Sequence, residues 1–311
     1  MQFTVKSEEN GITVREFVKK HGVSAALLAR LKRDEQGIVL NGTRVTVRAV
    51  LCEGDTLTLA VEDSTPSEKL VPFEKEVEIL LETPDYLVVN KPPFMPTHQS
   101  HGHFTDTLAN ALFWRCGREN PSFRPRFVNR LDRNTSGTVL VAKHALSAAA
   151  LSAQMAGKLI GKVYMALVLG KISAKMVLET GIRRREESII VREVCELCEG
   201  DLAITHVTPL LVGENLTLVA LYPETGRTHQ LRVHMTHLGA PILGDDLYGT
   251  SDERMPRHAL HAAAISFADT KDGKTVRVFA DFAPDMRDLI LNEFGEEGLR
   301  VAREYCRSCL A

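Results

Sequence analysis

The segment Phe127–Lys143, FVNRLDRNTSGTVLVAK, contains the most informative local pattern in the chain. An apolar pair leads into Arg130 and Leu131, the turn-forming letters RNTSG follow Asp132, and TVLVA has the composition of a buried strand. The pattern therefore predicts a carboxylate, Asp132, on a loop that enters a strand, flanked by Arg130 and Arg133. Loop carboxylates commonly serve as turn residues, so this pattern alone leaves a structural and a catalytic role open.

A second segment, Pro223–Gly249 (PETGRTHQLRVHMTHLGAPILGDDLYG), concentrates basic side chains around a predicted strand-to-helix transition. Arg227 and the helix start that follows it form a positive locus suited to an anion. A metal site would have to use His229, His234 and His237. Their spacing matches no standard metalloenzyme motif, so helix packing and RNA contact are the preferred interpretations and no metal is expected.

A third segment, Gly161–Gly170 (GKVYMALVLG), alternates in a way that predicts a strand with two distinct faces. Lys162, Tyr164 and Ala166 share one face, and the residues between them share the other. A strand tyrosine is commonly a packing residue, so the significance of Tyr164 depends on what accompanies it.

The order of the predicted elements gives the fold class and the domain boundaries. From residue 73 onward, strands and helices interleave without regular βαβ spacing, which predicts an α+β domain over 73–311 with a mixed, largely antiparallel sheet flanked by helices. The polar, proline-containing stretch 63–72 is predicted to be a linker. The predicted elements include strands at Thr138–Ala142, Val163–Leu169, Ile189–Val191, Thr217–Leu221 and Thr275–Phe279, and helices at Ala145–Ala156, His229–Leu238 and Met286–Glu293.

Residues 1–62 are predicted to form a separate small α/β unit. Two helical patterns, Val14–His21 and Ser24–Arg33, precede a hairpin in which Asn41-Gly42 joins strands Ile38–Leu40 and Val45–Val47. The sequences GIVLNGTRV and CEGDTLTL that follow the helices resemble the S4-like RNA-binding domain. One basic cluster could contact phosphates or could simply be a solvated helix end; its members are Arg30, Lys32 and Arg33.

Composition gives weaker information about partners and location. The net charge of −2 and the pI of about 6.6 do not suggest a protein that coats nucleic acid nonspecifically. The opening MQFTVKSEEN lacks the pattern of a secretory signal, and the apolar runs are too short to span a bilayer. We therefore expect a cytoplasmic protein without membrane contact.

Six cysteines are expected to be free thiols in such a chain. The C-x-x-C pairs Cys195/Cys198 and Cys306/Cys309 leave a four-sulfur zinc site as an alternative. Their wide separation is unlike that of compact zinc ribbons, so the thiol interpretation is preferred.

Taken together, the three segments resemble the RluA-type family of RNA pseudouridine synthases over residues Glu76–Phe282. The resemblance is carried, in that family's order, by RLDRNTSG, GKVYMALVLG, ETGRTHQLRVHMTHLGAPILGD and RHALHA (Arg257–Ala262). The opening DYLVVNKPPFMPTH (Asp85–His98) also resembles the start of that catalytic domain, and an S4-like domain ahead of it is a known arrangement in the family.

The resemblance implies an enzyme that isomerises uridine in RNA without a cofactor. It implies Asp132 as the nucleophile, whether by attack on C1′, by attack on C6 or by acting as a base. It also implies that Arg227 pairs with Asp132 and that Tyr164 is an active-site residue. Stacking of its ring on the uracil is the preferred role, and removal of the C5 proton by its hydroxyl is the alternative. One departure is Asn129, where the family usually has histidine before the Arg-Leu-Asp motif.

The resemblance further implies which residues contact RNA. Arg130 corresponds to the side chain that fills the space left by the flipped base, and Arg126 and Arg133 flank the same motif. His229 and Arg232 are also expected to contact RNA. Arg130 itself lies in a basic stripe that supports phosphate contact: Arg115, Arg118, Arg124, Arg126, Arg130 and Arg133.

The expected partner is RNA, with ribosomal RNA favoured because S4-like domains often accompany that substrate; transfer RNA remains open, and a monomer is expected. A noncatalytic RNA-binding or ribosome-assembly protein is the main alternative, supported only by Asn129. A glycoside hydrolase would need a second carboxylate, for which Glu224 is the nearest candidate, and its motif context does not support that role.

Overall fold

A computed structural model describes residues 1–61, 70–100 and 102–309 of the chain. Within these residues the N-terminal unit has two helices, a 3₁₀ turn and a four-stranded antiparallel sheet in the order β1-β4-β2-β3. The elements are β1 (Gln2–Thr4), η1 (Ser7–Glu9), α1 (Val14–Lys20), α2 (Ala25–Arg33), β2 (Ile38–Leu40), β3 (Thr43–Arg44) and β4 (Thr56–Leu59).

The helices of this unit begin where the sequence places capping residues. Thr13 caps α1 in a reciprocal box with Glu16, and the Ser24 hydroxyl accepts the backbone N–H of Leu27 at the start of α2. The predicted helices and the strand Ile38–Leu40 are thus confirmed, whereas the resemblance to the S4 domain stays a prediction.

The predicted strand at Val45–Val47 is wrong. Asn41 and Gly42 both have positive φ, as a two-residue primed turn requires, so pairing resumes at once with Leu40 opposite Thr43. The second hairpin strand is consequently β3. Beyond Arg44, one hydrogen bond from the N–H of Val45 to the carbonyl of Ile38 (3.1 Å) ends the pairing. The predicted linker at 63–72 falls largely on residues 62–69, which lie outside the described residues.

In the described part of the remaining chain, eleven strands form one mixed sheet with the path β11-β10-β12-β13-β9-β14-β8-β6-β5; β15 pairs with β14, and β7 pairs with β8. The pairing of β14 with β8 is parallel and the other pairings are antiparallel. The predicted α+β class with a mixed, largely antiparallel sheet is therefore confirmed. The strands are β5 (Glu78–Glu82), β6 (Tyr86–Lys91), β7 (Arg126–Phe127), β8 (Ser136–Ala142), β9 (Gly161–Leu169), β10 (Met176–Arg184), β11 (Arg192–Cys195), β12 (Asp201–Val212), β13 (Leu216–Pro223), β14 (Leu260–Ala268) and β15 (Thr275–Phe279).

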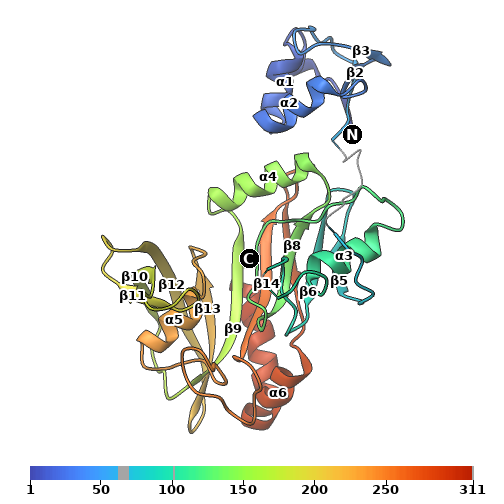
Figure 1. The fold of residues 1–311 in the computed structure, drawn as a ribbon. Helices are drawn as coiled ribbons and strands as arrows, with labels where there is room; N and C mark the ends of the chain where they lie inside the picture. The colour runs from blue at the N-terminus through green and yellow to red at the C-terminus, as the bar shows by residue number, and fades with distance from the viewer. Residues whose placement is uncertain (62–69, 101, 310–311) are drawn as a thin grey trace.

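Helices cover both faces of the central strands (Figure 1). They are α3 (Leu108–Cys116), α4 (Ala145–Ala156), α5 (Gln230–His237) and α6 (Pro284–Cys309). Alternate residues of β8 belong to two different cores: Val139 and Val141 share one with α3 and α6, whereas Leu140 shares the other with α4. Burial on both faces explains why TVLVA is a continuous apolar run.

Two further predictions about the elements need correction. Ile189–Val191 is not a strand but part of the turn between β10 and β11, because the Ser188 hydroxyl accepts the N–H groups of Ile190 and Val191 and closes the turn. The C-terminal helix is longer than predicted, and α6 continues past a break at Gly295, where φ is 64°.

The N-terminal unit and α4 share an apolar contact. Leu146 of α4 belongs to the same core cluster as Phe17 and Leu27 of the N-terminal helices. Figure 1 shows this unit, in blue, next to α4. None of the helices in the described ranges is both long and apolar enough to cross a bilayer.

Candidate active site

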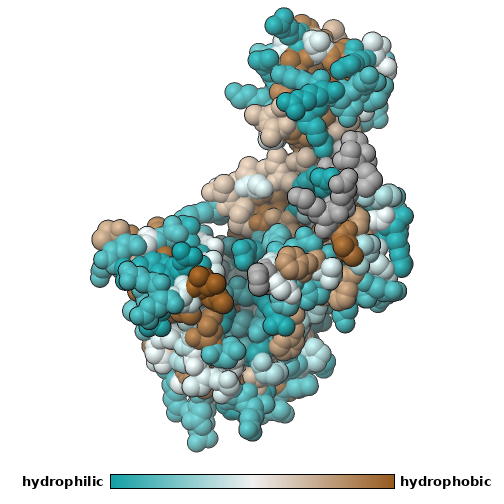
Figure 2. Space-filling model, viewed as in Figure 1, coloured by the Kyte–Doolittle hydropathy of each residue, from teal (hydrophilic) through white to brown (hydrophobic). Residues whose placement is uncertain are grey.

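Asp132 lies on the loop between β7 and β8, at the wall of a cleft of about 630 Å³. The cleft separates the lobe of β10–β13 and α5 from the body that contains α3 and α4, and Figure 2 shows the surface hollowed there. Its lining includes Asp132, Tyr164 and Arg227, which the sequence proposes for catalysis, and also His229 and Arg232. The structure thus brings together segments that are far apart in the sequence.

The backbone of the Asp132 loop is held by side chains from other segments. The Thr97 hydroxyl donates to the carbonyl of Leu131 (2.9 Å) and accepts its N–H (3.3 Å). The N–H of Thr135 donates to the carbonyl of Asp132 at 3.1 Å and closes the turn. The carboxylate itself, with its side chain 24% exposed, is therefore presented to the cleft from an ordered loop.

Two buried cations also hold the Asp132 loop by hydrogen bonds to its backbone carbonyls. The sequence assigned a role to neither of them. Lys91 donates to the carbonyls of Arg133 (3.1 Å), Pro92 and Met95 (both 2.8 Å). Burial lowers the pKa of Lys91 to about 7, with a further lowering by Arg257, while the negative charge of Asp132 opposes both.

Arg257 is the second buried cation. It donates to the carbonyl of Asn134 at 2.9 Å and forms a bidentate pair with Asp285 of α6, at 2.7 and 2.8 Å. The loop that carries Asp132 is thus fixed to both β6 and α6. Lys91 lies in the motif NKPP and Arg257 in the motif RHALHA, but neither motif by itself indicates which backbone carbonyls its cation binds.

Asn129, where the sequence departs from the family pattern, forms hydrogen bonds with the backbone of the sheet. Its amide oxygen accepts the N–H of Leu140 at 2.7 Å, and its amide nitrogen donates to the carbonyl of Thr138 at 3.2 Å. One amide thereby supplies both a donor and an acceptor to strand β8, which extends the pairing of β7 toward Asp132.

Arg232 is the arginine that pairs with Asp132. Its Nη1 lies 3.6 Å from Oδ2 of Asp132, while Nε and Nη2 donate to the two oxygens of Asp245, both at 2.7 Å. The side chains of Arg232 and Asp245 are only 6% and 1% exposed. Burial by itself would raise the pKa of Asp245, but the hydrogen bonds and charge of Arg232 outweigh burial and hold that pKa below its ordinary value.

The predicted pairing of Arg227 with Asp132 is therefore wrong. Arg227 precedes α5, its Nε donates to the carbonyl of Leu202 at 3.0 Å, and its Nη1 lies 3.8 Å from Asp201. Its side chain is 41% exposed. Arg232, which the sequence places among the RNA contacts, instead lies in the first turn of α5 with its guanidinium directed inward to two carboxylates.

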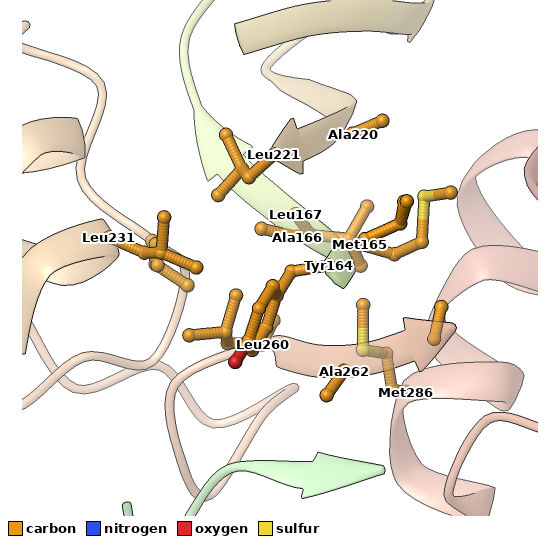
Figure 3. Close-up of a cluster of buried hydrophobic side chains, with 14 of the residues drawn as sticks. Tyr164, Met165, Ala166, Leu167, Ala220, Leu221, Leu231, Leu260, Ala262 and Met286 are labelled. Carbon is orange, nitrogen blue, oxygen red and sulfur yellow. The ribbon is translucent and has the colours of Figure 1, made fainter. Parts of the chain in front are cut away.

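Tyr164 projects from β9 into the apolar end of the cleft. Figure 3 shows its ring beside Leu231 and Leu260, whereas Met165 lies toward Met286 on the other side of the strand, as the predicted alternation requires. Burial raises the pKa of the Tyr164 phenol, and the charge of Asp132 raises it further. A phenol that stays protonated near neutral pH is better suited to stacking on a base than to removing a proton.

The remaining predicted RNA contacts occupy different environments. Arg130 and Arg133 are exposed, and Arg126 is half-buried with its Nη1 donating to the carbonyl of Arg124. In the N-terminal unit, Lys32 and Arg33 are exposed. Arg30 instead donates to the carbonyls of Ala60 and Val61, at 3.1 and 2.8 Å, and so supports the end of the sheet.

Glu224, the candidate second carboxylate, lines the same cleft. It is engaged by His206 at 2.6 Å and by Lys158 at 3.7 Å. The hydrogen bond and charge of His206 lower the pKa of Glu224. A carboxyl held ionised is unsuited to the general-acid role that a glycoside hydrolase requires. Across the described ranges, no three His, Cys, Asp or Glu side chains are grouped as metal ligands.

Three buried histidines should make the free energy of unfolding depend on pH. Burial lowers the pKa values of His234, His258 and His261 to about 4, 3 and 4. The unfolded chain, with histidine pKa values of about 6.5, binds more protons than the folded chain below that pH. We therefore expect the free energy of unfolding to fall between pH 6.5 and pH 4, by about 2 kcal/mol per histidine at about pH 5.

Urea unfolding at about pH 7 and about pH 5 measures this dependence. His234→Gln removes one titrating group, so the loss of stability between the two pH values should be about 2 kcal/mol smaller than in the unmodified protein. An equal loss in both proteins would contradict the assignment of His234 as a buried neutral side chain.

Comparison with known proteins decides the family. Residues 85–237 match the family model described as RNA pseudouridylate synthase. The chain is also 36% identical over 283 residues to the uncharacterized RNA pseudouridine synthase YjbO of Bacillus subtilis, covering 91% of this chain and 99% of that protein. The chain belongs to the RNA pseudouridine synthase family.

Other members of the RNA pseudouridine synthase family support the assignment. The ribosomal large subunit pseudouridine synthase D of Zymomonas mobilis is 33% identical over 287 residues, which cover 85% of this chain and 90% of that protein. The solved structure of human RNA pseudouridylate synthase domain containing 1 is similar with a TM-score of 0.57 and 29% identity, covering 68% of this chain and 86% of that one. The predicted RluA-type family and the predicted enzyme class are both confirmed.

Proposed function

We propose that this RNA pseudouridine synthase isomerises a uridine in ribosomal RNA and uses Asp132 as its nucleophile. The observation that carries the proposal is the pairing of the carboxylate Asp132 with the buried cation Arg232 in a cleft that the Tyr164 ring also lines. The guanidinium of Arg232 orients the carboxylate within the cleft, and a carboxylate oxygen is the atom that attacks.

The reaction breaks the N1–C1′ bond, turns the uracil and rejoins it through C5, so it transfers no electrons and needs no group donor. Attack of Asp132 on C1′, attack on C6 and action as a base toward a glycal intermediate all use the same ionised carboxylate. A uridine stacked in an RNA helix cannot reach a carboxylate on a cleft wall, so the target nucleotide must flip out, at a cost of a few kcal/mol. Arg130, exposed beside Asp132, is the side chain proposed to fill the vacated position.

Two lines of reasoning favour ribosomal RNA. The relative from Zymomonas mobilis is named a ribosomal large subunit pseudouridine synthase, and so is a relative from Neisseria meningitidis at 30% identity. The N-terminal unit is proposed to be an S4-like RNA-binding domain that contacts phosphates through the exposed Lys32 and Arg33. Transfer RNA is the alternative substrate.

A transcriptome-wide pseudouridine map tests the proposal. The map uses carbodiimide labelling and reverse-transcription stops in cells that lack the gene, complemented with either the unmodified gene or Asp132→Ala. Loss of a discrete ribosomal RNA site, restored only by the unmodified gene, is the expected result. A lost site in transfer RNA would reassign the substrate, and restoration by Asp132→Ala would remove Asp132 from its role.

A further inference from the structure

His229 stands at the start of α5 in a backbone conformation that histidine rarely adopts. Its φ and ψ are 57° and 16°, in the left-handed region, and its side chain makes no capping hydrogen bond to the helix. This conformation costs a residue with a Cβ about 1–2 kcal/mol, and asparagine or glycine tolerates it better. An imidazole kept at such a position indicates a use for the ring outside helix capping.

The ring is oriented by a hydrogen-bonded chain that begins at β11. The backbone N–H of Arg192 donates to the hydroxyl oxygen of Tyr248 at 2.8 Å, and that hydroxyl lies 2.8 Å from Nδ1 of His229. The hydroxyl has one proton and no other acceptor among the described residues, so donation to Nδ1 is the arrangement that uses this proton within the chain. A neutral imidazole that accepts at Nδ1 has its own proton on Nε2.

This Nε2–H faces the reacting centre. Nε2 lies 3.9 Å from Oδ2 of Asp132, beyond hydrogen-bond length, and the His229 side chain on the cleft wall is only 13% exposed. No acceptor within the described ranges is in reach of it. Burial lowers the pKa of His229, with the charges of Arg232 and Arg192 adding to the effect and Asp132 opposing it, so the ring is neutral near pH 7.

We propose that His229 is a further catalytic residue whose Nε2–H donates a hydrogen bond to a carbonyl oxygen of the uracil while the base is detached from the ribose. This inference rests on the proposed function of Asp132. Tyr248 is the positioning residue that selects the tautomer, acting through the imidazole and not on the base.

The bond changes explain why a donor is needed. When an oxygen of Asp132 bonds to C1′ and the N1–C1′ bond breaks, the electron pair passes to N1 and the uracil becomes an anion whose charge extends to its carbonyl oxygens. C5 then bonds to C1′ and releases the carboxylate, C5 loses its proton to water, and N1 takes one from water. The His229 proton stays on Nε2 throughout, as expected for electrostatic stabilisation of the transition state.

His229→Asn is the first test. Asparagine fits the left-handed backbone but does not extend as far as Nε2, so the melting temperature should stay the same or rise. With transcribed large-subunit ribosomal RNA tritiated at uridine C5, release of tritium to water reports product. We expect kcat to fall about 10²–10³-fold, as when one such donor is removed elsewhere, with KM changed less than about threefold. His237→Asn, an exposed histidine of the same helix, is the matched control and should match the unmodified protein.

Tyr248→Phe is the second test, because it removes only the hydroxyl and keeps the ring that lies 5.0 Å from the Arg232 guanidinium. Without the donor, Nδ1 and Nε2 share the proton, and we expect kcat to fall about tenfold, as for the loss of one hydrogen bond. Nitrogen-15 NMR of His229 should show the proton on Nε2 in the unmodified protein and a mixture of tautomers in Tyr248→Phe.

Three outcomes would overturn the inference: an unchanged kcat in His229→Asn, a proton on Nδ1 in the unmodified protein, or parallel losses of melting temperature and RNA affinity that indicate a structural role. Other results would contradict the proposed function itself. If the unmodified protein acts on transfer RNA instead, the ribosomal assignment fails and the same comparison is made on that RNA. If Asp132→Asn remains active, the nucleophile is wrong and this inference falls with it.

Discussion

Asp132→Asn should abolish pseudouridine formation, with a loss of turnover of about 10⁴-fold or more, while the protein stays folded. Asparagine has nearly the same shape but no negative charge, so it is a poor nucleophile. The replaced side chain is 24% exposed and lies 3.6 Å from its cation, so the free energy of unfolding should change by only about 1 kcal/mol. RNA affinity should stay the same or rise slightly, because a negative charge leaves a basic cleft.

Tritium release from C5-labelled RNA and a filter-binding titration measure the two quantities separately. Asp201→Asn is the matched control, because this carboxylate lies on the same lobe but is 73% exposed and faces Arg227. It should retain turnover. Turnover by Asp132→Asn at the rate of the control would refute the assignment of the nucleophile.

Arg232→Gln should be nearly as damaging to activity and much more damaging to stability. It leaves Asp245, 1% exposed, without its cation, and removal of one partner of a buried pair costs about 3–5 kcal/mol. Asp132 loses its cation in the same change, and we expect kcat to fall by about 10²–10³-fold, as for the loss of one preorganised electrostatic contact. Arg232→Lys keeps the charge but cannot bridge both carboxylates, so it should recover part of the stability and little of the rate.

Arg227→Gln is the decisive comparison, because the two arginines are alternatives for the same role. Arg227 is exposed, and its partners are one carbonyl and the exposed carboxylate of Asp201, so its loss should cost at most about 1 kcal/mol of stability and should leave kcat within about threefold. Urea unfolding and single-turnover kinetics on both variants distinguish the two. A larger fall of kcat in Arg227→Gln than in Arg232→Lys would restore the pairing that the sequence alone predicts.

Local features of the sequence determined the positions of Asp132, the proposed nucleophile, and of the Tyr164 ring. RNTSG forms a turn and TVLVA forms a strand because of the backbone preferences of their own residues, so Asp132 had to lie on the loop before β8. The two-residue alternation of β9 likewise fixed Tyr164 and Met165 on opposite faces. The helix Ala145–Ala156 and the strand Thr275–Phe279 follow from the same local rules.

Pairings between distant charges could not be derived in this way. Arg227 and Arg232 belong to one short segment, and both are compatible with a site at the start of α5. Which one meets Asp132 depends on where the helix begins and on the second carboxylate, Asp245, that binds the inward-facing arginine. The cations Lys91 and Arg257 were equally undetermined, because their acceptors are backbone carbonyls of a loop distant in sequence.

The sequence by itself therefore determined the fold class, the family and the place of the proposed nucleophile, since these depend on periodicity, on turn chemistry and on the order of long motifs. The tertiary structure decided which arginine pairs with Asp132, which cations hold its loop and which hydroxyl lies against Nδ1 of His229. The physical reason is burial: a charge or a polar hydrogen removed from water must find a partner, and only the packed chain determines which partner is within reach.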